Sequence, residues 1–139
     1  MARAWVLPAT MAALAVFVLV TGGADTVSIV TALVLLMVGW LISPLLFPRH
    51  VDDARARHEA AARGVPIVYW RPGCMFCVRL RLALGRRAGR ALWVDIHRDR
   101  AAAVRVRGFN GGNETVPTVV AGDEVRTNPD PGWLRARLP

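Results

Sequence analysis

The chain has 139 residues and a formal net charge of +8, and all 18 of its basic residues are arginine. This length allows one small domain together with an additional segment. Two cysteines are too few for the multi-disulfide framework of a small secreted protein. The arginines are dispersed and form no nucleic-acid-binding motif, so we predict no nucleic-acid partner.

Two uncharged, apolar stretches, residues 4–21 and 27–47, fill most of the N-terminal third. At 1.5 Å per residue the first gives a helix of about 27 Å, just enough for the hydrocarbon core of a thin bilayer. Neither stretch has the polar face that a helix of a soluble domain would show. We therefore predict that residues 1–48 form a membrane anchor of two transmembrane helices. The alternative for the first stretch is a cleaved signal peptide, since Arg3 precedes it and the small residues 22–24 follow it.

The arginines that flank the two stretches predict the orientation of the anchor. The short loop between the stretches has no arginine and carries Asp25, whereas Arg3 precedes the first stretch. Four arginines follow the second stretch (Arg49, Arg55, Arg57 and Arg63). By the positive-inside rule, both termini are expected in the cytoplasm. We therefore predict a protein of the cell membrane whose C-terminal domain faces the cytoplasm, unless one stretch fails to insert.

Residues 49–64 are predicted to be a basic juxtamembrane linker that contains a short helix. Asp52 or Asp53 can cap this helix, and Gly64 can end it. From residue 65 onward, strand and helix patterns alternate. Strands are expected at residues 65–70, 90–96, 116–121 and 123–127, and helices at residues 77–89, 100–108 and 129–138. Residues 65–139 are thus predicted to form an α/β domain in which a four-stranded mixed sheet has helices on both faces.

Cys74 and Cys77 lie at the junction between the first strand and the next helix, in the stretch YWRPGCMFCVRLR (residues 69–81). This order of elements, with a C-x-x-C motif directly after the first strand, is that of the thioredoxin fold. Unpaired N–H groups at a helix N-terminus favour the thiolate, so we expect a lowered pKa for Cys74. Cys77 follows about one helical turn later and is expected to be more buried and to act as the resolving thiol.

Other roles for the two cysteines fit the sequence less well. A zinc site would need further ligands at suitable spacing, and haem attachment would need a histidine where Val78 stands. A purely structural role would not explain why both cysteines lie at a strand–helix junction. We therefore predict a redox pair and no metal site.

Val116 and Pro117 open the third strand. A proline at this position fits a cis peptide bond beside the thiols, which would leave the Val116 backbone free to pair with an extended substrate. The alternative is an ordinary trans proline of an edge strand.

The segments YWRPGCMFC, VDI, NGGNETVPTV and TNP together resemble the glutaredoxin family, especially its actinobacterial branch, the mycoredoxins. The resemblance covers residues 65–139, and the combination of NGGNxTVPTV with TNP is specific, whereas a C-x-x-C alone is not. It implies a thioredoxin fold, with Cys74 as nucleophile, Cys77 as resolving cysteine and Pro117 as the cis-proline. It also implies a low-molecular-weight thiol as cosubstrate, with no bound cofactor.

Two departures from the family pattern bear on the identity of that thiol. Met75-Phe76 stands between the cysteines where glutathione-using members commonly have Pro-Tyr, and RTNPD replaces their Gly-Gly followed by Asp. These differences favour mycothiol over glutathione. By position in the family pattern, Arg71 is expected to meet a carboxylate of the thiol. The other candidate pocket residues are Met75, Phe76, Thr115, Val116, Thr127 and Asn128.

The residues leave four functions open. The favoured one is a membrane-anchored thiol–disulfide oxidoreductase that reduces protein disulfides or protein–mycothiol mixed disulfides, with an NADPH-dependent disulfide reductase upstream. The runner-up is an electron donor supplied by thioredoxin reductase. A third is a membrane-tethered binding module that bridges an iron–sulfur cluster between two copies, and a fourth places the redox chemistry outside the membrane.

Overall fold

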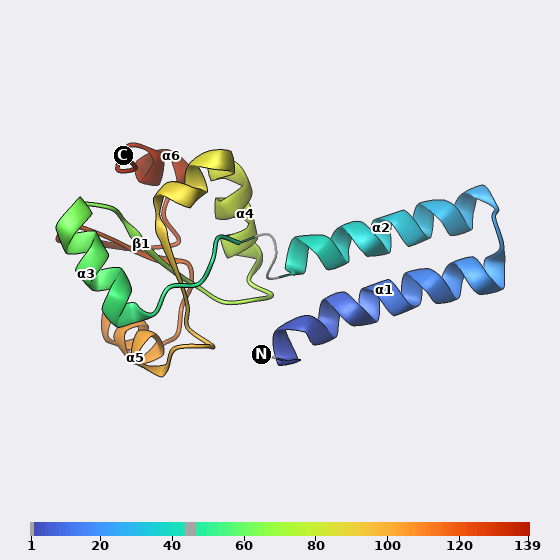
Figure 1. Ribbon diagram of the computed structural model, residues 1–139, viewed down its shortest axis with the longest axis horizontal. Coiled ribbons are helices and arrows are strands. Elements are labelled where there is room, and N and C mark those ends of the chain that lie inside the picture. Colours follow the sequence, from blue (N-terminus) through green and yellow to red (C-terminus); the bar gives the residue numbers. More distant parts are fainter. Residues whose placement is uncertain (1, 44–46) are drawn as a thin grey trace. The chain divides into compact units, whose positions relative to one another are not determined.

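The computed structural model describes residues 2–43 and 47–139 and divides the chain into two compact units, with the boundary between Leu46 and Phe47. The first unit is a pair of apolar helices and the second is an α/β domain (Figure 1). The second unit begins well before residue 65 and includes the segment predicted to be a linker.

The two helices of the first unit, α1 (Ala2–Gly22) and α2 (Thr26–Ile42), pack against each other along a seam of small residues. Ala15, Ala32 and Gly39 are buried in this seam. A Cβ atom on Gly39 would lie only 3.1 Å from the Cβ of Met11, so the two backbones approach closely at this point. Small residues are what allow such close approach between apolar helices.

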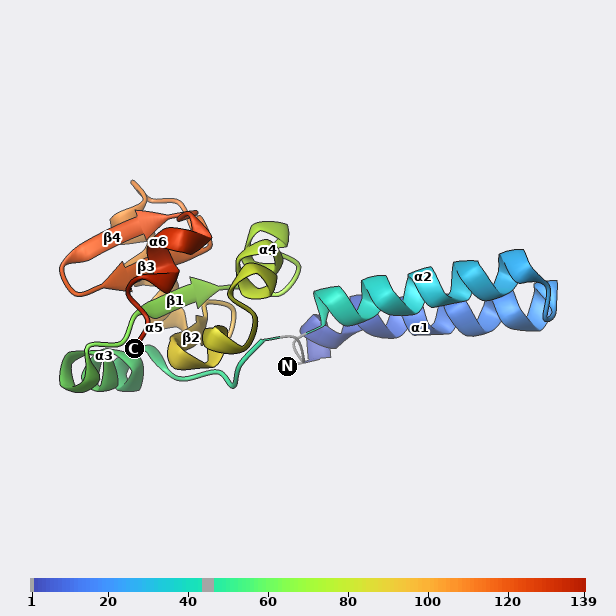
Figure 2. The same cartoon turned by 90° about the horizontal axis from the view of Figure 1, so that it is seen from above.

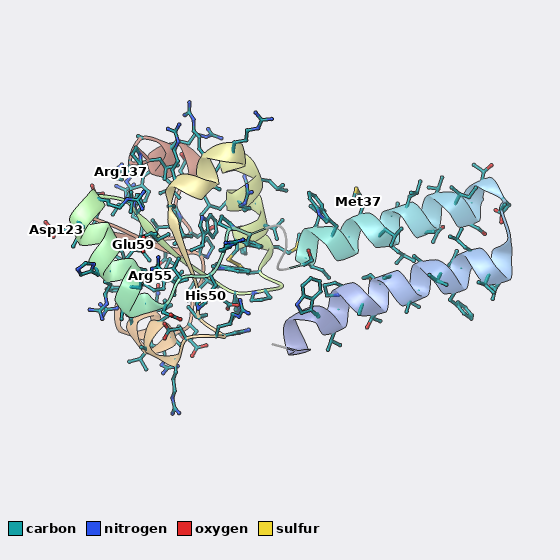
Figure 3. All side chains as sticks on the ribbon, in the orientation of Figure 1. Met37, His50, Arg55, Glu59, Asp123 and Arg137 are labelled. Atoms are coloured by element: carbon teal, nitrogen blue, oxygen red, sulfur yellow. A yellow bond between two sulfur atoms is a disulfide. The ribbon has the colours of Figure 1, made fainter. Side chains whose placement is uncertain are left out.

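Large apolar side chains cover the outside of this pair. Met37 is 55% exposed and points away from α1 (Figure 3), and most other large side chains of both helices are also exposed. Among the described helices, α1 alone is long and apolar enough to cross a membrane, over residues Trp5–Gly22, a property that a signal sequence shares. α2 has 17 residues, or about 25 Å, and residues 44–46 of the predicted second segment lie outside the described residues. One helix of spanning length is therefore found where two were predicted.

The domain is built on a four-stranded sheet in the order β2-β1-β3-β4 (Figure 2). The strands are β1 (Ile67–Trp70), β2 (Leu92–Asp95), β3 (Thr118–Ala121) and β4 (Glu124–Thr127). β1 runs parallel to β2 and antiparallel to β3, and β3 pairs antiparallel with β4. Every strand lies inside its predicted range, so the mixed four-stranded sheet is confirmed.

Helices cover both faces of the sheet (Figure 1). α4 (Met75–Leu84), the 3₁₀ helix that continues it (Gly85–Arg90) and α6 (Pro131–Arg135) lie on one face, and α3 (Asp53–Arg63) and α5 (Arg100–Phe109) lie on the other. Trp93 of β2 contacts the first group, because its indole N–H donates to the carbonyl of Ala88 at 2.8 Å. Tyr69 of β1 contacts the second group, because its hydroxyl donates to the carboxylate of Asp53 at 2.6 Å.

The segment before α3 packs as part of the domain. The ring of Phe47 stacks on Trp70 with centroids 3.8 Å apart and meets Trp93 edge-on at 5.5 Å. His50 bridges in parallel to Trp93, and its Nδ1 accepts the N–H of Asp95 at 3.0 Å. The bonds of His50, together with that from the N–H of Val51 to the carbonyl of Trp93 at 3.1 Å, satisfy backbone groups at the outer edge of β2. The predicted domain boundary at residue 65 thus falls inside the second compact unit.

The N-terminus of α3 is capped by a residue distant in the sequence. Asp52 occupies the N-cap position, but its side chain makes no capping hydrogen bond. The N–H of Asp53 donates instead to Oδ2 of Asp99, at 2.7 Å. The other oxygen of Asp99 caps α5, where it accepts the N–H groups of Ala101 and Ala102 at 2.9 and 3.1 Å.

Candidate active site

Cys74 is the N-cap residue of α4 and follows β1 through the short turn at residues 71–73. Its Sγ accepts the N–H of Cys77 at 3.2 Å. Gly73, directly before it, has a φ of 78°, a left-handed conformation that glycine adopts without a steric penalty. The sulfur therefore lies against the N-terminus of a helix, where the partial positive charge favours a thiolate.

The two cysteines differ in their accessibility. They are joined as a disulfide, with Cα atoms 5.2 Å apart, which is within the usual range. Cys77 is fully buried, whereas Cys74 keeps part of its surface exposed. In thiol–disulfide exchange, only a thiol that the substrate can reach can attack it, and a buried neighbour acts on the mixed disulfide from inside. Cys77 is thus the more buried of the two cysteines, as predicted.

Val116 and Pro117 form one wall of the site. The peptide bond between them is cis, as predicted. The carbonyl oxygen of Val116 lies 3.4 Å from the Sγ of Cys74. Both residues are buried, so their backbone is held firmly beside the cysteine pair.

A cluster of polar side chains holds the loop that carries Val116 and Pro117. Asn110, just past the end of α5, donates to Oγ1 of Thr118 at 3.1 Å and accepts from the hydroxyl of Thr127. Thr118 in turn donates to the carbonyl of Thr115 at 2.7 Å. Thr127, a predicted pocket residue, is thus bonded within this cluster. Asn110 and Thr118 were not among the predicted site residues, although both lie in the NGGNETVPTV segment that carried the family resemblance.

A groove of about 160 Å³ opens beside the C-x-x-C motif. Phe76, Arg79 and Leu80 of α4 line one side, and residues 128–131, between β4 and α6, line the other. Of the predicted pocket residues, Phe76 and Asn128 are brought together here. Arg79 and Asp130 place one positive and one negative side chain in the lining, and neither was among the predicted pocket residues.

Of the predicted pocket residues, only Phe76 and Asn128 line the groove. The N–H of Asn128 donates to the carbonyl of Pro117 at 2.7 Å, which connects the groove to the wall formed by the cis peptide. Arg71 and Thr115 are exposed, and Met75 is 63% exposed. The structure therefore groups Phe76 and Asn128 in one groove and leaves Arg71, Met75 and Thr115 on the open surface around it.

Comparison with known proteins decides the family. Residues 67–126, which contain Cys74, Cys77 and Pro117, match the glutaredoxin family. A protein of Mycobacterium tuberculosis (strain H37Rv), named "Putative glutaredoxin Rv3198A", is 43% identical over 74 residues, which cover 51% of this chain and 86% of that relative. This chain belongs to the glutaredoxin family. The protein named "Putative glutaredoxin MT3292", of strain CDC 1551 of the same species, has the same identity and coverage.

Family membership and the Cys74–Cys77 pair make this glutaredoxin a thiol redox protein with a thioredoxin-like fold. The family match begins at β1, so α1, α2 and α3 all lie outside it. Within residues 2–43 and 47–139, no three His, Cys, Asp or Glu side chains gather as metal ligands.

Proposed function

We propose that this glutaredoxin is a membrane-anchored thiol–disulfide oxidoreductase that reduces protein disulfides or protein–mycothiol mixed disulfides. The observation that carries the proposal is the geometry of the cysteine pair. A partly exposed Cys74 caps a helix, with a buried Cys77 bonded behind it and the carbonyl of Val116 3.4 Å from its sulfur.

In the first step, the thiolate of Cys74 attacks the mycothiol sulfur of a protein–mycothiol mixed disulfide. A bond forms between Cys74 and mycothiol, the original disulfide breaks, and the protein leaves as a thiolate that takes a proton from water. The N–H of Cys77, which lies 3.2 Å from the sulfur, supports this role because hydrogen bonds and the helix N-terminus stabilise the attacking anion.

In the second step, a thiolate attacks the disulfide between Cys74 and mycothiol. If a second mycothiol attacks the mycothiol sulfur, Cys74 leaves as a thiolate and mycothiol disulfide forms, which an NADPH-dependent reductase returns to the thiol. If Cys77 attacks the sulfur of Cys74, mycothiol leaves and the Cys74–Cys77 disulfide forms, which is the state seen here. A protein disulfide is reduced by the Cys77 route, with a protein sulfur in place of mycothiol. Two mycothiol molecules then reduce the Cys74–Cys77 disulfide and become mycothiol disulfide.

We assign the groove beside Phe76 to the small thiol. It begins at a residue between the two cysteines, which would bring a bound thiol close to Cys74, and Arg79 offers a cation for a polar or anionic group. Asp130 already caps α6, so part of its hydrogen-bonding capacity is used within the protein. We also assign to this ligand the exposed Arg71, which stands three residues before Cys74.

We further propose that α1 and α2 both cross the cell membrane and that the redox domain faces the cytoplasm. The exposed apolar surface of the pair and its seam of small residues support two packed spans. The arginines that follow residue 48 support the orientation, because positively charged segments stay on the cytoplasmic side. A reporter that is active only in the cytoplasm, fused to the C-terminus, should be active; an inactive reporter would contradict the orientation.

The activity is tested with the full chain in nanodiscs and a protein–mycothiol mixed disulfide as substrate. We expect NADPH oxidation when mycothiol and its reductase supply the electrons, and slower turnover with the matching glutathione substrate and glutathione reductase. Turnover that requires thioredoxin reductase would favour the electron-donor alternative. No turnover with any of the three systems would contradict an oxidoreductase function.

A further inference from the structure

Helix α4, which begins directly after Cys74, carries an unusual set of exposed apolar side chains. Met75, Phe76 and Leu82 are 63%, 57% and 50% exposed. Met75, Arg79 and Leu82 follow the i, i+4, i+7 spacing that places residues on one side of a helix, and Phe76 lies next to them. The outer face of the active-site helix is therefore an apolar stripe with an arginine in it.

Within α4 and the 3₁₀ helix that continues it, all charged side chains are basic. Residues 75–90 contain five arginines (Arg79, Arg81, Arg86, Arg87 and Arg90) and no acidic residue. Arg81 and Arg90 donate to backbone carbonyls. Within the described part of the chain, Arg79, Arg86 and Arg87 form no ion pair, and Arg86 and Arg87 are exposed. Apolar side chains beside unpaired cations are the composition of helices that lie in the interface of an anionic membrane.

The domain is attached to its apolar helices at the same end and on the same face as this stripe. Phe47, its first residue, stacks on Trp70, the last residue of β1 and four residues before Cys74. Phe47 also meets Trp93, whose side chain bonds to the 3₁₀ helix that continues α4. Only residues 44–46 separate Phe47 from Ser43. A fully extended chain spans at most about 3.6 Å per residue, so the Cα atoms of Ser43 and Phe47 lie no more than about 14 Å apart.

We propose that the α4 stripe and the arginines after it rest on anionic lipid headgroups, so that Cys74 works at the membrane surface. This inference rests on the proposed membrane insertion of the apolar helices. The disulfides within reach of Cys74 are then those at the level of the headgroups, in the juxtamembrane segments of membrane proteins. Lipid is favoured over a protein partner because the apolar stripe and the arginines share one continuous segment, residues 75–90, and the apolar helices join the domain at Phe47, which packs on Trp70 just before that segment.

Oxidative footprinting of the full chain in nanodiscs tests the proposal. Hydroxyl radicals label exposed side chains, and mass spectrometry reads each site. We expect Met75 and Leu82 to be oxidised several-fold less in phosphatidylglycerol-containing nanodiscs than in pure phosphatidylcholine nanodiscs, and the protection to weaken in about 0.5 M salt because salt screens surface charges. Val104 of α5, which is 54% exposed on the opposite face of the domain, should be oxidised equally in both lipids.

Two double variants with the same change in charge supply the control. Arg86→Gln with Arg87→Gln should abolish the lipid-dependent protection, whereas Arg98→Gln with Arg100→Gln, at the start of α5, should leave it intact. Equal oxidation of Met75 and Leu82 in both lipids would overturn the proposal, as would loss of protection in both double variants alike. Turnover of a soluble mixed disulfide, measured in parallel, reports separately on the proposed function, because none of the four arginines lines the groove or contacts Cys74.

Discussion

Asp99 uses the two oxygens of one carboxylate to cap two helices. Oδ1 accepts from the start of α5, and Oδ2 accepts from the N–H of Asp53 at the start of α3. Partial burial raises the pKa of Asp99, but the hydrogen bonds from the N–H groups of Asp53, Ala102 and Ala101 outweigh burial, so its net pKa is below the usual value. The ionised form of Asp99 is therefore the one that stabilises the fold.

Replacement of Asp99 by alanine should destabilise the domain by about 2 kcal/mol near neutral pH, because each of two helix caps is worth about 1 kcal/mol. A carboxylate with a lowered pKa contributes stability above the unfolded-state pKa of about 4 and loses it as pH falls through the folded-state pKa. The difference between wild type and Asp99→Ala should thus be constant above about pH 5 and shrink below pH 4. Urea unfolding of the full chain in detergent, followed by tryptophan fluorescence, measures both effects. A difference that does not depend on pH would contradict the double cap.

The cap at α5 could be predicted from the sequence, because an aspartate directly before a helical pattern is a local signal. The cap at α3 could not, because Asp53 and Asp99 are 46 positions apart and only the folded sheet brings them together. The sequence therefore suggested Asp52 or Asp53 as the cap, whereas the side chain of Asp52 makes no such bond.

At the scale of elements, α3 is fastened to the sheet through the buried carboxylate of Asp53. Its Oδ1 accepts the hydroxyl of Tyr69 at 2.6 Å, and its Oδ2 accepts from Arg57 at 3.0 Å and from Arg105 of α5 at 3.2 Å. Burial and the hydrogen bond to Asp53 raise the pKa of Tyr69, so the Tyr69 hydroxyl keeps its proton and remains a donor. Asp53 therefore connects α3, β1 and α5 in one cluster.

Asp53→Ala should destabilise the domain by about 3 kcal/mol, because it leaves the buried Tyr69 hydroxyl unpaired and two arginines without their partner. Asp52→Ala is the matched control: this neighbouring aspartate is exposed and only approaches His50, at 3.4 Å, so its loss should change stability by less than about 0.5 kcal/mol. Denaturant unfolding of both variants measures the difference. Equal effects would mean that α3 is a loosely attached linker.

The strands and most helices follow from local patterns. β1 reads as a short β-branched and aromatic run, and its burial on both faces agrees with a central strand. The helix predicted at residues 77–89 differs in detail, since α4 begins at Met75 and gives way to a 3₁₀ helix at Gly85. The groove was harder to predict, because Arg79 and Asp130 are distant in the sequence. They line one groove only because α4 packs beside the segment between β4 and α6.

At the scale of the whole molecule, the chain joins two units of different chemistry. The apolar pair exposes most of its large hydrophobic side chains, whereas the redox domain buries most of its own in a core that includes Trp70 and Trp93. The attachment of the domain at Phe47 was not evident from the sequence, because Phe47 reads as the end of the apolar run. The ring of Phe47 stacks on Trp70, which lies four residues before Cys74, and this contact makes Phe47 part of the domain.

The central claim is that Cys74 is the nucleophile and Cys77 resolves the mixed disulfide. Mass spectrometry of full-length variants, mixed with a protein–mycothiol mixed disulfide, tests this claim most directly. Cys77→Ser should accumulate one mycothiol on Cys74, since the internal resolving thiol is gone, and Cys74→Ser should release no reduced protein and carry no mycothiol. Release of reduced protein by Cys74→Ser at the wild-type rate would contradict the assignment.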